Sequence, residues 1–281
     1  MKAEWGVVKN GIAPLYGHPD SKTPRKDEML CGMEAEIWEQ AGVWCYVRTA
    51  YGYEGYMRTE EFIHPGEIWV NAEKWQVRSS FADVLDRPQV QAVVLAELPR
   101  GARVAMREVG QSAGDREAAD GLPLGWCAVR LPSGMCGYMQ KSRLEPLPKG
   151  TRQAQTVLRK RLTECALSYL GVSYRWGGKT PMGIDCSGLV FMSYWLCGIT
   201  IWRDAQIREG FLVRPIPIGR AKPGDLLYFP GHVAMLLDGE RYIHATGKAG
   251  SDGVVVNTLS AGKEGYRADL RNNLRAVGSI F

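Results

Sequence analysis

Apolar and polar residues follow two successive patterns along the chain. Up to about residue 147, short runs rich in β-branched and aromatic residues alternate with glycine-containing turns, which predicts strands. From Leu158 to Tyr169, apolar residues recur at the spacing of one helical face, and the pattern stops at Gly171. A second helix is predicted from Asp185 to about Cys197. Strands are predicted afterwards at 226–229, 232–237 and 241–244.

The first half contains an internal repeat with a constant offset of 82 residues. Segment 44–48 (WCYVR) returns as 126–130 (WCAVR), and segment 55–57 (GYM) returns as 137–139 (GYM). Each copy predicts two short strands joined by a glycine turn and preceded by another strand. Short strands at close spacing predict a small β-barrel for each copy. The preceding strands are expected at 35–39 and 102–108.

These patterns predict a multidomain chain with two small β-barrels followed by an α+β domain. We expect the barrels at 1–66 and 67–147 and the α+β domain at 150–281, after a proline-rich boundary. The second copy carries an insertion at 110–125, which predicts a polar loop. Helices come first and strands later in the last domain, which is typical of an α+β arrangement.

One cysteine differs from the other six in its surroundings. Cys186 stands in the segment Asp185-Cys186-Ser187-Gly188, a polar stretch that opens the second predicted helix. The helix dipole and the free backbone N–H groups at such a position favour the thiolate, so we expect the pKa of Cys186 to be lowered. The other cysteines lie in apolar or strand patterns and are expected to be small buried residues.

A cysteine nucleophile needs a histidine to carry the proton and a third group to orient that histidine. Of the four histidines, His18 and His64 fall in segments expected to be exposed. His232 and His244 fall on two adjacent predicted strands, where cross-strand side chains come within about 5 Å. The residue numbers 232 and 244 sum to an even value. Their side chains can therefore point to the same face of the sheet only if the loop between the two strands has an odd number of residues or a bulge intervenes.

These motifs together resemble the NlpC/P60 cysteine peptidases over about 150–281. The resemblance implies a papain-like core, with Cys186 as nucleophile, His232 as base and His244 as its orienting partner. Members of that family cut peptidoglycan peptides, commonly after γ-linked D-Glu. The barrel repeat, G-x-W-x-x-V-R-x-x-x-G-x-x-G-Y, resembles bacterial SH3-type (SH3b) domains. The matching peptidase segments are YRWGG at 174–178, DCSG at 185–188, PGDL at 223–226, GHVA at 231–234 and YIHA at 242–245.

The domain order resembles the γ-D-glutamyl-L-diamino acid dipeptidyl-peptidase group of that family. In this group the first SH3b domain closes the substrate groove, a free N-terminal L-Ala is required, and L-Ala-γ-D-Glu is released. The resemblance implies that Asp185 binds the substrate ammonium and that Ser187 lies in the same subsite. It also implies that Tyr174 and Trp176 line the groove. The segment Arg203-Asp204-Ala205 resembles a further substrate contact, for which Ala205 offers no side-chain hydroxyl.

Two tyrosines distinguish the first barrel copy from the second. Tyr51 and Tyr53 are replaced by Ser133 and Met135, whereas the tryptophan and glycines of the repeat recur. A tyrosine that is needed only in the first copy is a candidate to reach the peptidase site, Tyr53 before Tyr51. Glu28 is a further candidate partner for the substrate ammonium, and an exposed loop glutamate is the competing interpretation.

Composition and charge narrow the function classes. The 281 residues are 45% hydrophobic and 23% charged, which is typical of soluble globular proteins. The net charge is +5 with no long Lys/Arg run, so no nucleic-acid partner is expected. Met1–Trp5 lacks the apolar run of a signal peptide, and 188–202 is too short to cross a bilayer, so we expect no membrane association and a cytoplasmic monomer. No C-x-x-C pair occurs, and neither a metal nor another cofactor is expected.

The combined features predict a peptidase that cuts between γ-D-Glu and a diamino acid in murein peptides with a free N-terminal L-Ala, as in cell-wall peptide recycling. One alternative is a secreted peptidoglycan endopeptidase that uses SH3b domains as wall anchors. A second is a non-catalytic SH3b binding protein, which the intact Cys186, His232 and His244 disfavour. An endopeptidase must accept L-Ala that is amide-linked to muramic acid. A requirement for a free N-terminal amine therefore distinguishes the recycling peptidase from the secreted endopeptidase. Lysine and diaminopimelate are both open as the diamino acid.

Overall fold

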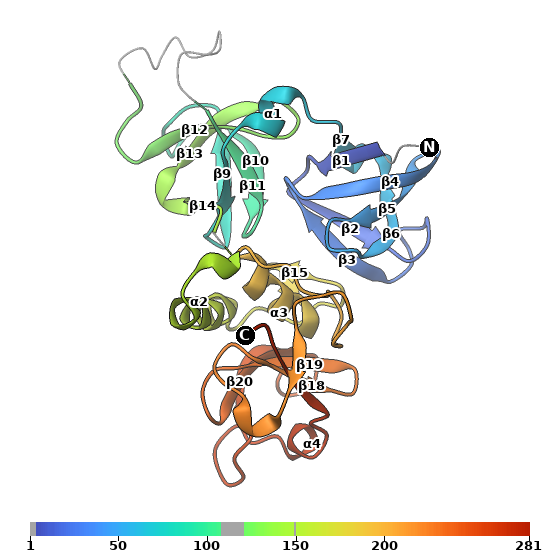
Figure 1. The fold of residues 1–281 in the computed structure, drawn as a ribbon. Coiled ribbons are helices and arrows are strands. Elements are labelled where there is room, and N and C mark those ends of the chain that lie inside the picture. The colour runs from blue at the N-terminus through green and yellow to red at the C-terminus, as the bar shows by residue number, and fades with distance from the viewer. Residues whose placement is uncertain (1–3, 108–120, 149) are drawn as a thin grey trace. The chain divides into compact units, whose positions relative to one another are not determined.

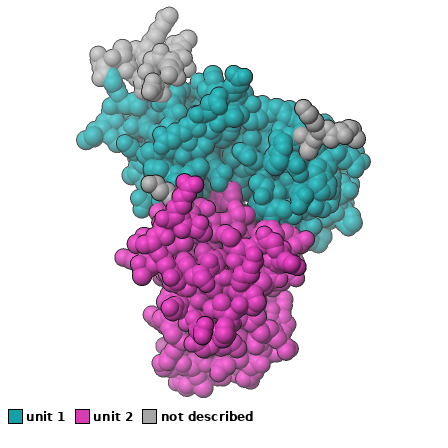
Figure 2. Space-filling model, in the orientation of Figure 1, with its two compact units in different colours: residues 1–147 teal, residues 148–281 magenta. Residues whose placement is uncertain are grey.

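The computed structural model describes residues 4–107, 121–148 and 150–281 and shows two compact units (Figure 1). The units are 1–147 and 148–281 (Figure 2). Most of the predicted insertion loop, 110–120, lies outside the described residues. The first unit is rich in β-sheet and the second is α+β, so the predicted fold class is confirmed. Among the described residues, no helix is long and apolar enough to cross a membrane.

The first seven strands form one antiparallel sheet with the order β3-β2-β6-β5-β4-β1-β7. Side chains on one face of these strands are buried, among them Leu15, Val47 and Met57. The alternation of buried and exposed positions along β2 and β5 is that of a sheet with one solvent-facing side. The elements are β1 (Glu4–Val8), β2 (Ile12–Tyr16), β3 (Arg25–Leu30), β4 (Glu34–Ala41), β5 (Trp44–Thr49), β6 (Glu54–Arg58), η1 (Thr59–Glu61) and β7 (Phe62–Ile63).

The second sheet repeats the strand order of the first, as β10-β9-β13-β12-β11-β8-β14. Strands β5 and β6 are offset from β12 and β13 by the same 82 residues found in the sequence. The sequence repeat is therefore a structural repeat, while the boundary at 66/67 stays a prediction. The elements are α1 (Glu67–Asn71), β8 (Lys74–Val77), β9 (Phe81–Leu85), β10 (Val94–Pro99), β11 (Arg103–Arg107), β12 (Trp126–Arg130), β13 (Cys136–Gln140), η3 (Lys141–Arg143) and β14 (Leu144–Pro146).

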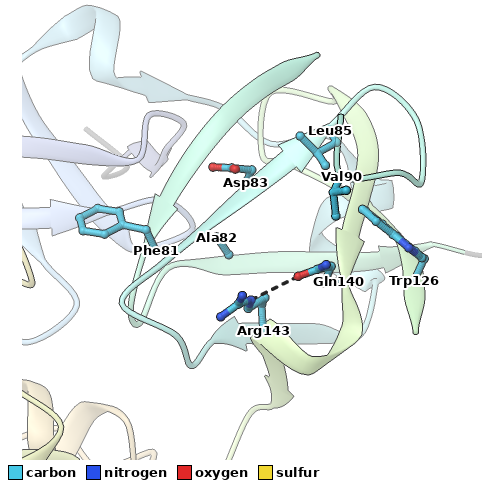
Figure 3. Close-up of a pocket in the computed structure, with 8 residues that line it drawn as sticks. All are labelled: Phe81, Ala82, Asp83, Leu85, Val90, Trp126, Gln140 and Arg143. Carbon is cyan, nitrogen blue, oxygen red and sulfur yellow. Dashed lines mark hydrogen bonds between the residues drawn. The ribbon is translucent and has the colours of Figure 1, made fainter. Parts of the chain in front are cut away.

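The two sheets differ around their repeated tryptophan. In the first, the Arg58 guanidinium lies over the Trp44 ring, 4.7 Å from its centroid. The position of Arg58 is taken by Gln140 in the second, where Trp126 lines a cavity of about 300 Å³ and Gln140 accepts a hydrogen bond from Arg143 (3.3 Å; Figure 3). In the second sheet Trp126 thus borders a pocket, whereas a guanidinium lies over its counterpart Trp44 in the first sheet. The other residues that line the pocket are Phe81, Ala82, Asp83, Leu85 and Val90.

The second unit packs helices against a six-stranded antiparallel sheet with the order β17-β22-β18-β19-β20-β21. Helix α3 is buried along its whole length because α2 lies on one side of it and strands β19 and β20 on the other. A helix that is apolar all round suits this place. The elements are η4 (Gly150–Arg152), α2 (Gln155–Leu167), β15 (Lys179–Thr180), β16 (Gly183–Ile184), α3 (Cys186–Trp195), β17 (Arg214–Ile216), η5 (Ile218–Arg220), β18 (Leu226–Phe229), β19 (His232–Leu236), β20 (Arg241–Thr246), β21 (Gly253–Thr258), α4 (Ala268–Arg271) and β22 (Ala276–Ser279).

A fully buried carboxylate ties α2 to the sheet. Asp225, just before β18, accepts hydrogen bonds from Arg159 Nη1 (2.9 Å) and from Ser279 Oγ (2.6 Å). The backbone N–H of Lys222 donates to its second oxygen at 2.8 Å. These donors satisfy a buried charge that would otherwise be costly. The PGD segment at 223–225 thus has a structural role in joining α2, β18 and β22.

All seven cysteines are free thiols. Cys45 and Cys127 occupy equivalent places in the two sheets, and each thiol donates to the carbonyl of the methionine opposite. In the second unit, the sulfurs of Cys165 on α2 and Cys197, just after α3, are 4.0 Å apart. The expectation that the six cysteines other than Cys186 are buried holds for Cys31, Cys45, Cys127 and Cys197. It is wrong for Cys136 and Cys165, which are partly exposed.

Candidate active site

Cys186 is the first residue of α3, as the sequence predicts. Asp185 caps the helix from an extended backbone conformation, and its Oδ1 accepts the backbone N–H of Gly188 at 2.6 Å. A side chain at position 188 would collide with the Gly178 carbonyl, so only glycine allows this close approach. The DCSG segment therefore supplies the cap, the thiol and the packing of the helix start.

The Cys186 sulfur is shielded from water and lies near two backbone N–H groups. They belong to Ser187 and to Val233, the residue after His232. The side chain is only 7% exposed, and burial raises its pKa to about 11, with the Asp185 charge adding to the rise. Arg203 and the two N–H groups act in the opposite direction. The expectation of a lowered thiol pKa is thus wrong, because desolvation outweighs the helix N-terminus.

His232 and His244 are brought together across two strands. Leu236 of β19 lies opposite Tyr242 of β20, and the connection between them, 237–241, has an odd length. The two histidines consequently face the same side in a diagonal pair, as the sequence analysis required. His232 Nε2 lies 2.7 Å from His244 Nδ1, and the ring planes are almost perpendicular at 82°.

Burial keeps both imidazoles neutral. It lowers the pKa of His232 to about 3, with further lowering by His244 and by the Arg267 charge. Burial also lowers the pKa of His244 to about 4, although the hydrogen bond between His244 and Asn257 opposes this shift. Asp269 also favours the charged rings but is outweighed. The resting site therefore holds a neutral thiol beside a neutral histidine pair.

Asn257 on β21 is a site residue that the sequence analysis missed. Its Oδ1 lies 2.8 Å from His244 Nε2, and its Nδ2 donates to the Gly265 carbonyl at 2.9 Å. The available signal was a polar residue that ends the apolar run of a strand, at 254–256, next to the one carrying His244. Within the described residues, no group of three or more His, Cys, Asp and Glu side chains is placed to hold a metal ion.

Asp185 is paired inside the protein with Arg203. Arg203 Nη1 donates to Asp185 Oδ1 at 3.0 Å and Nη2 to Oδ2 at 3.1 Å, while Nη1 also donates to Ser187 Oγ at 2.7 Å. The Gly177 N–H donates to Asp185 Oδ2 at 2.8 Å. The role of Asp185 toward a substrate ammonium stays a prediction. Next along the chain, Asp204 and Ala205 lie in a partly buried bend.

The two groove residues expected before Cys186 differ in exposure. Tyr174 is half-buried, and burial followed by the Cys186 and Asp185 charges raises its pKa to about 12, which places its hydroxyl near both groups. It forms a parallel β-bridge with Ile184, next to the helix cap. Trp176 is 68% exposed and is free to contact a ligand through its ring face.

The candidates from the first unit gather around strand β3. The Tyr51 hydroxyl donates to the buried Asp27 carboxylate, and Lys26 Nζ lies 4.8 Å from the centre of the Tyr53 ring. Glu28 is fully buried on β3 and paired with Arg25, so the competing interpretation as an exposed loop glutamate is wrong. The ion pair explains how a strand buries this carboxylate. Contact of these side chains with substrate stays a prediction.

Comparison with known proteins agrees with this geometry. Residues 171–267, which include Cys186, His232 and His244, match the NlpC/P60 family. The chain is 39% identical to dipeptidyl-peptidase 6 of Lysinibacillus sphaericus over 279 residues, 98% of this chain and 99% of that protein. It is 34% identical to the γ-D-glutamyl-L-lysine dipeptidyl-peptidase of Bacillus subtilis (strain 168) over 93 residues, 29% of this chain and 30% of that one.

The fold also has a counterpart of nearly equal extent. The crystal structure of an NlpC/P60 family protein from Bacillus cereus ATCC 10987 superposes with a TM-score of 0.76. The superposition covers 98% of each chain at 20% sequence identity, so it speaks for the fold. Taken with the identity over almost the full length of the Lysinibacillus protein, it leads to one conclusion: this chain belongs to the NlpC/P60 family of cysteine peptidases.

Proposed function

We propose that the chain is a γ-D-glutamyl-L-diamino acid dipeptidyl-peptidase, which releases L-Ala-γ-D-Glu from murein peptides with a free N-terminal L-Ala. The observation that carries the proposal is the placement of Cys186 at the start of α3, near the N–H of Val233, the residue that follows His232 of the His232–His244 pair. The names of the two relatives, dipeptidyl-peptidase 6 and γ-D-glutamyl-L-lysine dipeptidyl-peptidase, support the substrate class.

The first half of the reaction is attack on the γ-carbonyl of D-Glu. Because the Cys186 thiol and His232 are both neutral at rest, the thiol proton passes to His232 as the C–S bond forms. Backbone N–H groups at the start of α3 are suited to stabilise the oxyanion, since the first turn of a helix has donors without helical partners. His232 then gives the proton to the leaving diamino-acid amine, and a thioester on Cys186 remains.

The second half returns the enzyme to its starting state. His232 removes a proton from water, and the resulting oxygen adds to the thioester carbonyl. Collapse of this adduct breaks the C–S bond, and the sulfur of Cys186 regains a proton from His232. L-Ala-γ-D-Glu leaves with a new carboxyl group. His244 holds the His232 ring throughout by its 2.7 Å hydrogen bond.

We assign substrate selection to the residues that line the groove, to the first barrel and to the residues that would contact the L-Ala-γ-D-Glu part of the substrate. In the second unit, Tyr174 and Trp176 would line the groove, supported by the closeness of Tyr174 to Cys186 and the exposure of the Trp176 ring. In the first, the barrel at 1–66 would close the groove and exclude longer chains. The residues proposed to contact L-Ala-γ-D-Glu, including its ammonium, are Asp185, Ser187, Asp204, Ala205, Glu28, Tyr51 and Tyr53.

A recycling role would place the enzyme, as a monomer, in the cytoplasm, where free murein peptides are degraded. The seven free cysteines support a reducing compartment, in which thiols persist. Fractionation of cells that express the full-length gene product tests this point. Activity that appears in the culture medium or the wall fraction would instead favour the secreted endopeptidase.

The experiment that tests the activity compares L-Ala-γ-D-Glu-L-Lys with its N-acetylated form, with products identified by mass spectrometry. N-acetylation removes the ammonium with its hydrogen bonds and adds bulk at the end of the groove that the first barrel would close, so it is expected to lower kcat/KM by about 10²–10³. Cys186→Ala is expected to abolish hydrolysis, while Cys136→Ala in the first unit serves as the cysteine control. Equal cleavage of acetylated peptide or of intact wall would refute the dipeptidyl-peptidase assignment in favour of the endopeptidase.

A further inference from the structure

The side-chain amide of Asn257 has only one orientation that satisfies its neighbours. Nδ2 lies 2.9 Å from the Gly265 carbonyl oxygen, and a carbonyl oxygen can only accept. The amide nitrogen must therefore face Gly265, which turns the acceptor Oδ1 toward His244 Nε2 at 2.8 Å. The flipped amide would set two acceptors against each other. The loop that ends in Gly265 thus determines what His244 meets.

An acceptor at His244 Nε2 decides where the protons of both rings lie. Oδ1 of Asn257 has no hydrogen to give, so Nε2 of His244 carries the proton of that neutral ring. Nδ1 of His244 is then a lone-pair acceptor, and the 2.7 Å contact requires His232 Nε2 to donate. A neutral His232 that is protonated on Nε2 has its free lone pair on Nδ1. The chain of bonds runs from the Gly265 carbonyl to the base.

We propose that Asn257 is a positioning residue that fixes the Nε2–H tautomer of His244 and, through it, of His232, so that His232 Nδ1 is the nitrogen that takes the proton of Cys186. The inference rests on the proposed function, in which His232 is the base. Nothing in the reaction requires Asn257 to touch the substrate. Its effect is to select one of two tautomers that an isolated neutral imidazole populates.

The surroundings of the pair make this selection necessary. The charged and titratable groups that face the histidines are Arg267, Asp269 and Tyr242, while Cys186 is the proposed reaction partner of His232. Arg267 and Asp269 are bound to each other, with Nη2 and Oδ2 2.6 Å apart, and Tyr242 contacts His244 through its ring. The Asn257 oxygen is the acceptor aligned with His244 Nε2.

Without the Asn257 oxygen as acceptor, the hydrogen bond between His244 and His232 can reverse its direction. With Nε2 of His244 unpaired, that ring can carry its proton on Nδ1 and donate it to His232 Nε2. His232 would then hold its own proton on Nδ1, where it no longer accepts one from Cys186. Asn257→Leu is therefore expected to lower kcat by about 10- to 100-fold and to leave KM almost unchanged.

A carboxylate at position 257 would preserve the tautomer but change its pH dependence. Asn257→Asp keeps an acceptor for His244 Nε2–H, so kcat at pH 8 is expected to stay within about tenfold of the wild-type value. The negative charge also favours doubly protonated His244, which would donate to His232 Nε2 and displace the base. The acid limb of the kcat profile is therefore expected to move upward by at least about one pH unit. Asn273→Ala, which removes another side-chain amide of the same unit, is the matched control.

The tautomers of His232 and His244 can also be observed directly in protein that keeps Asn257. In a His18→Gln/His64→Gln background, ¹⁵N-labelled histidine leaves only His232 and His244, and two-bond ¹H–¹⁵N correlations report which nitrogen carries the proton. Both rings are expected as the Nε2–H form at pH 7. A His232 ring protonated on Nδ1 overturns the inference, and the result does not depend on whether any Asn257 variant folds.

The kinetic outcomes separate this inference from the proposed function. If Cys186→Ala or His232→Ala hydrolyses the tripeptide at the wild-type rate, the proposed function fails. If both are inactive but Asn257→Leu has wild-type kcat, only the role of Asn257 fails. Equal losses in Asn257→Leu and Asn257→Asp at every pH, with no movement of the acid limb, would reduce Asn257 to a structural role and also overturn the inference.

Discussion

Arg203 holds both carboxylate oxygens of Asp185 from a position that is only 1% exposed. The guanidinium lies 3.0 Å from Oδ1 and 3.1 Å from Oδ2, in the two-pronged geometry that distinguishes arginine from lysine. The same carboxylate caps α3 through Gly188. An ion pair from outside the helix therefore holds the segment that begins with Cys186.

Removal of Arg203 alone is expected to be costly. Arg203→Met leaves the buried Asp185 charge without its partner and should lower the free energy of unfolding of the second unit by about 3–5 kcal/mol. The double variant Asp185→Asn/Arg203→Met should recover part of this loss, because no charge remains buried. Urea denaturation of the wild-type protein, the single variant and the double variant measures the loss of stability and its partial recovery. Arg241→Met breaks an exposed ion pair with Asp238 and should change stability by less than about 1 kcal/mol.

The raised thiol pKa predicts slow alkylation of Cys186 at neutral pH. Because the thiolate reacts and the pKa is about 11, the rate with iodoacetamide should rise about tenfold per pH unit between pH 7 and 10. Peptide mapping by mass spectrometry follows this residue separately from the other thiols. A rate that is already constant between pH 5 and 8 would instead reveal a thiolate–imidazolium pair and contradict the prediction.

The histidine pair predicts that the second unit loses stability in acid. The folded pKa values, about 3 for His232 and about 4 for His244, lie below the ordinary 6.5, so only the unfolded chain takes up protons between pH 6.5 and 4. Stability contributed by the neutral pair is complete above pH 6.5 and falls as pH falls. At pH 5 the two residues together should lower the free energy of unfolding by about 4 kcal/mol.

Urea titrations at pH 7 and pH 5 check this effect, with a pulse of hydrogen–deuterium exchange reporting on 232–246. His64→Gln, in the first unit, provides the control, because it alters no residue of the second unit. Replacement of both site histidines, as His232→Gln/His244→Gln, should remove most of the pH difference. A pH difference that persists in this double variant would assign the acid sensitivity to other groups.

Cys165 and Cys197 are expected to form a disulfide on mild oxidation. Their sulfurs are 4.0 Å apart, close enough for small side-chain rotations to reach bonding distance. Diamide would accept the two hydrogens of the thiol pair, and the cross-linked peptides would lose about 2 Da by mass spectrometry. Closure of the 165–197 loop should stabilise the second unit by about 3–4 kcal/mol. Oxidised Cys165→Ser protein, which cannot form the bond, should show neither change.

Elements with local patterns could be predicted from the sequence. The helix around Leu158, the helix that starts at Cys186 and the strand at 226–229 follow from hydrophobic spacing and from the polar DCSG segment that opens the second helix. The residue numbers of His232 and His244 required an odd-length connection or a bulge between their strands, and the connection 237–241 has an odd length. The repeat of 82 residues predicted two sheets of matching order. Each of these depends on residues close in sequence or on a simple offset.

Features that depend on distant residues escaped the sequence analysis. Asn257 becomes recognisable only when β21 pairs with β20, and Arg203 only when its segment folds against the helix cap. The thiol pKa of Cys186 was expected to follow the helix N-terminus, whereas the enclosure by surrounding strands decides it. Burial of Glu28 likewise requires its ion pair within the folded strand. Tertiary enclosure, which a local pattern does not encode, controls all four.

The diagonal placement of His232 and His244 constrains how this family member can change in length. One residue inserted into β20 between Tyr242 and His244 would turn His244 away from His232 unless a bulge absorbed it, because successive residues of a strand point to opposite faces. One residue inserted into the connection 237–241 would instead lengthen the turn and leave the pairing of β19 with β20 unchanged, at little cost. A library of single insertions across 237–244 should therefore keep activity in the turn and lose it inside the strand.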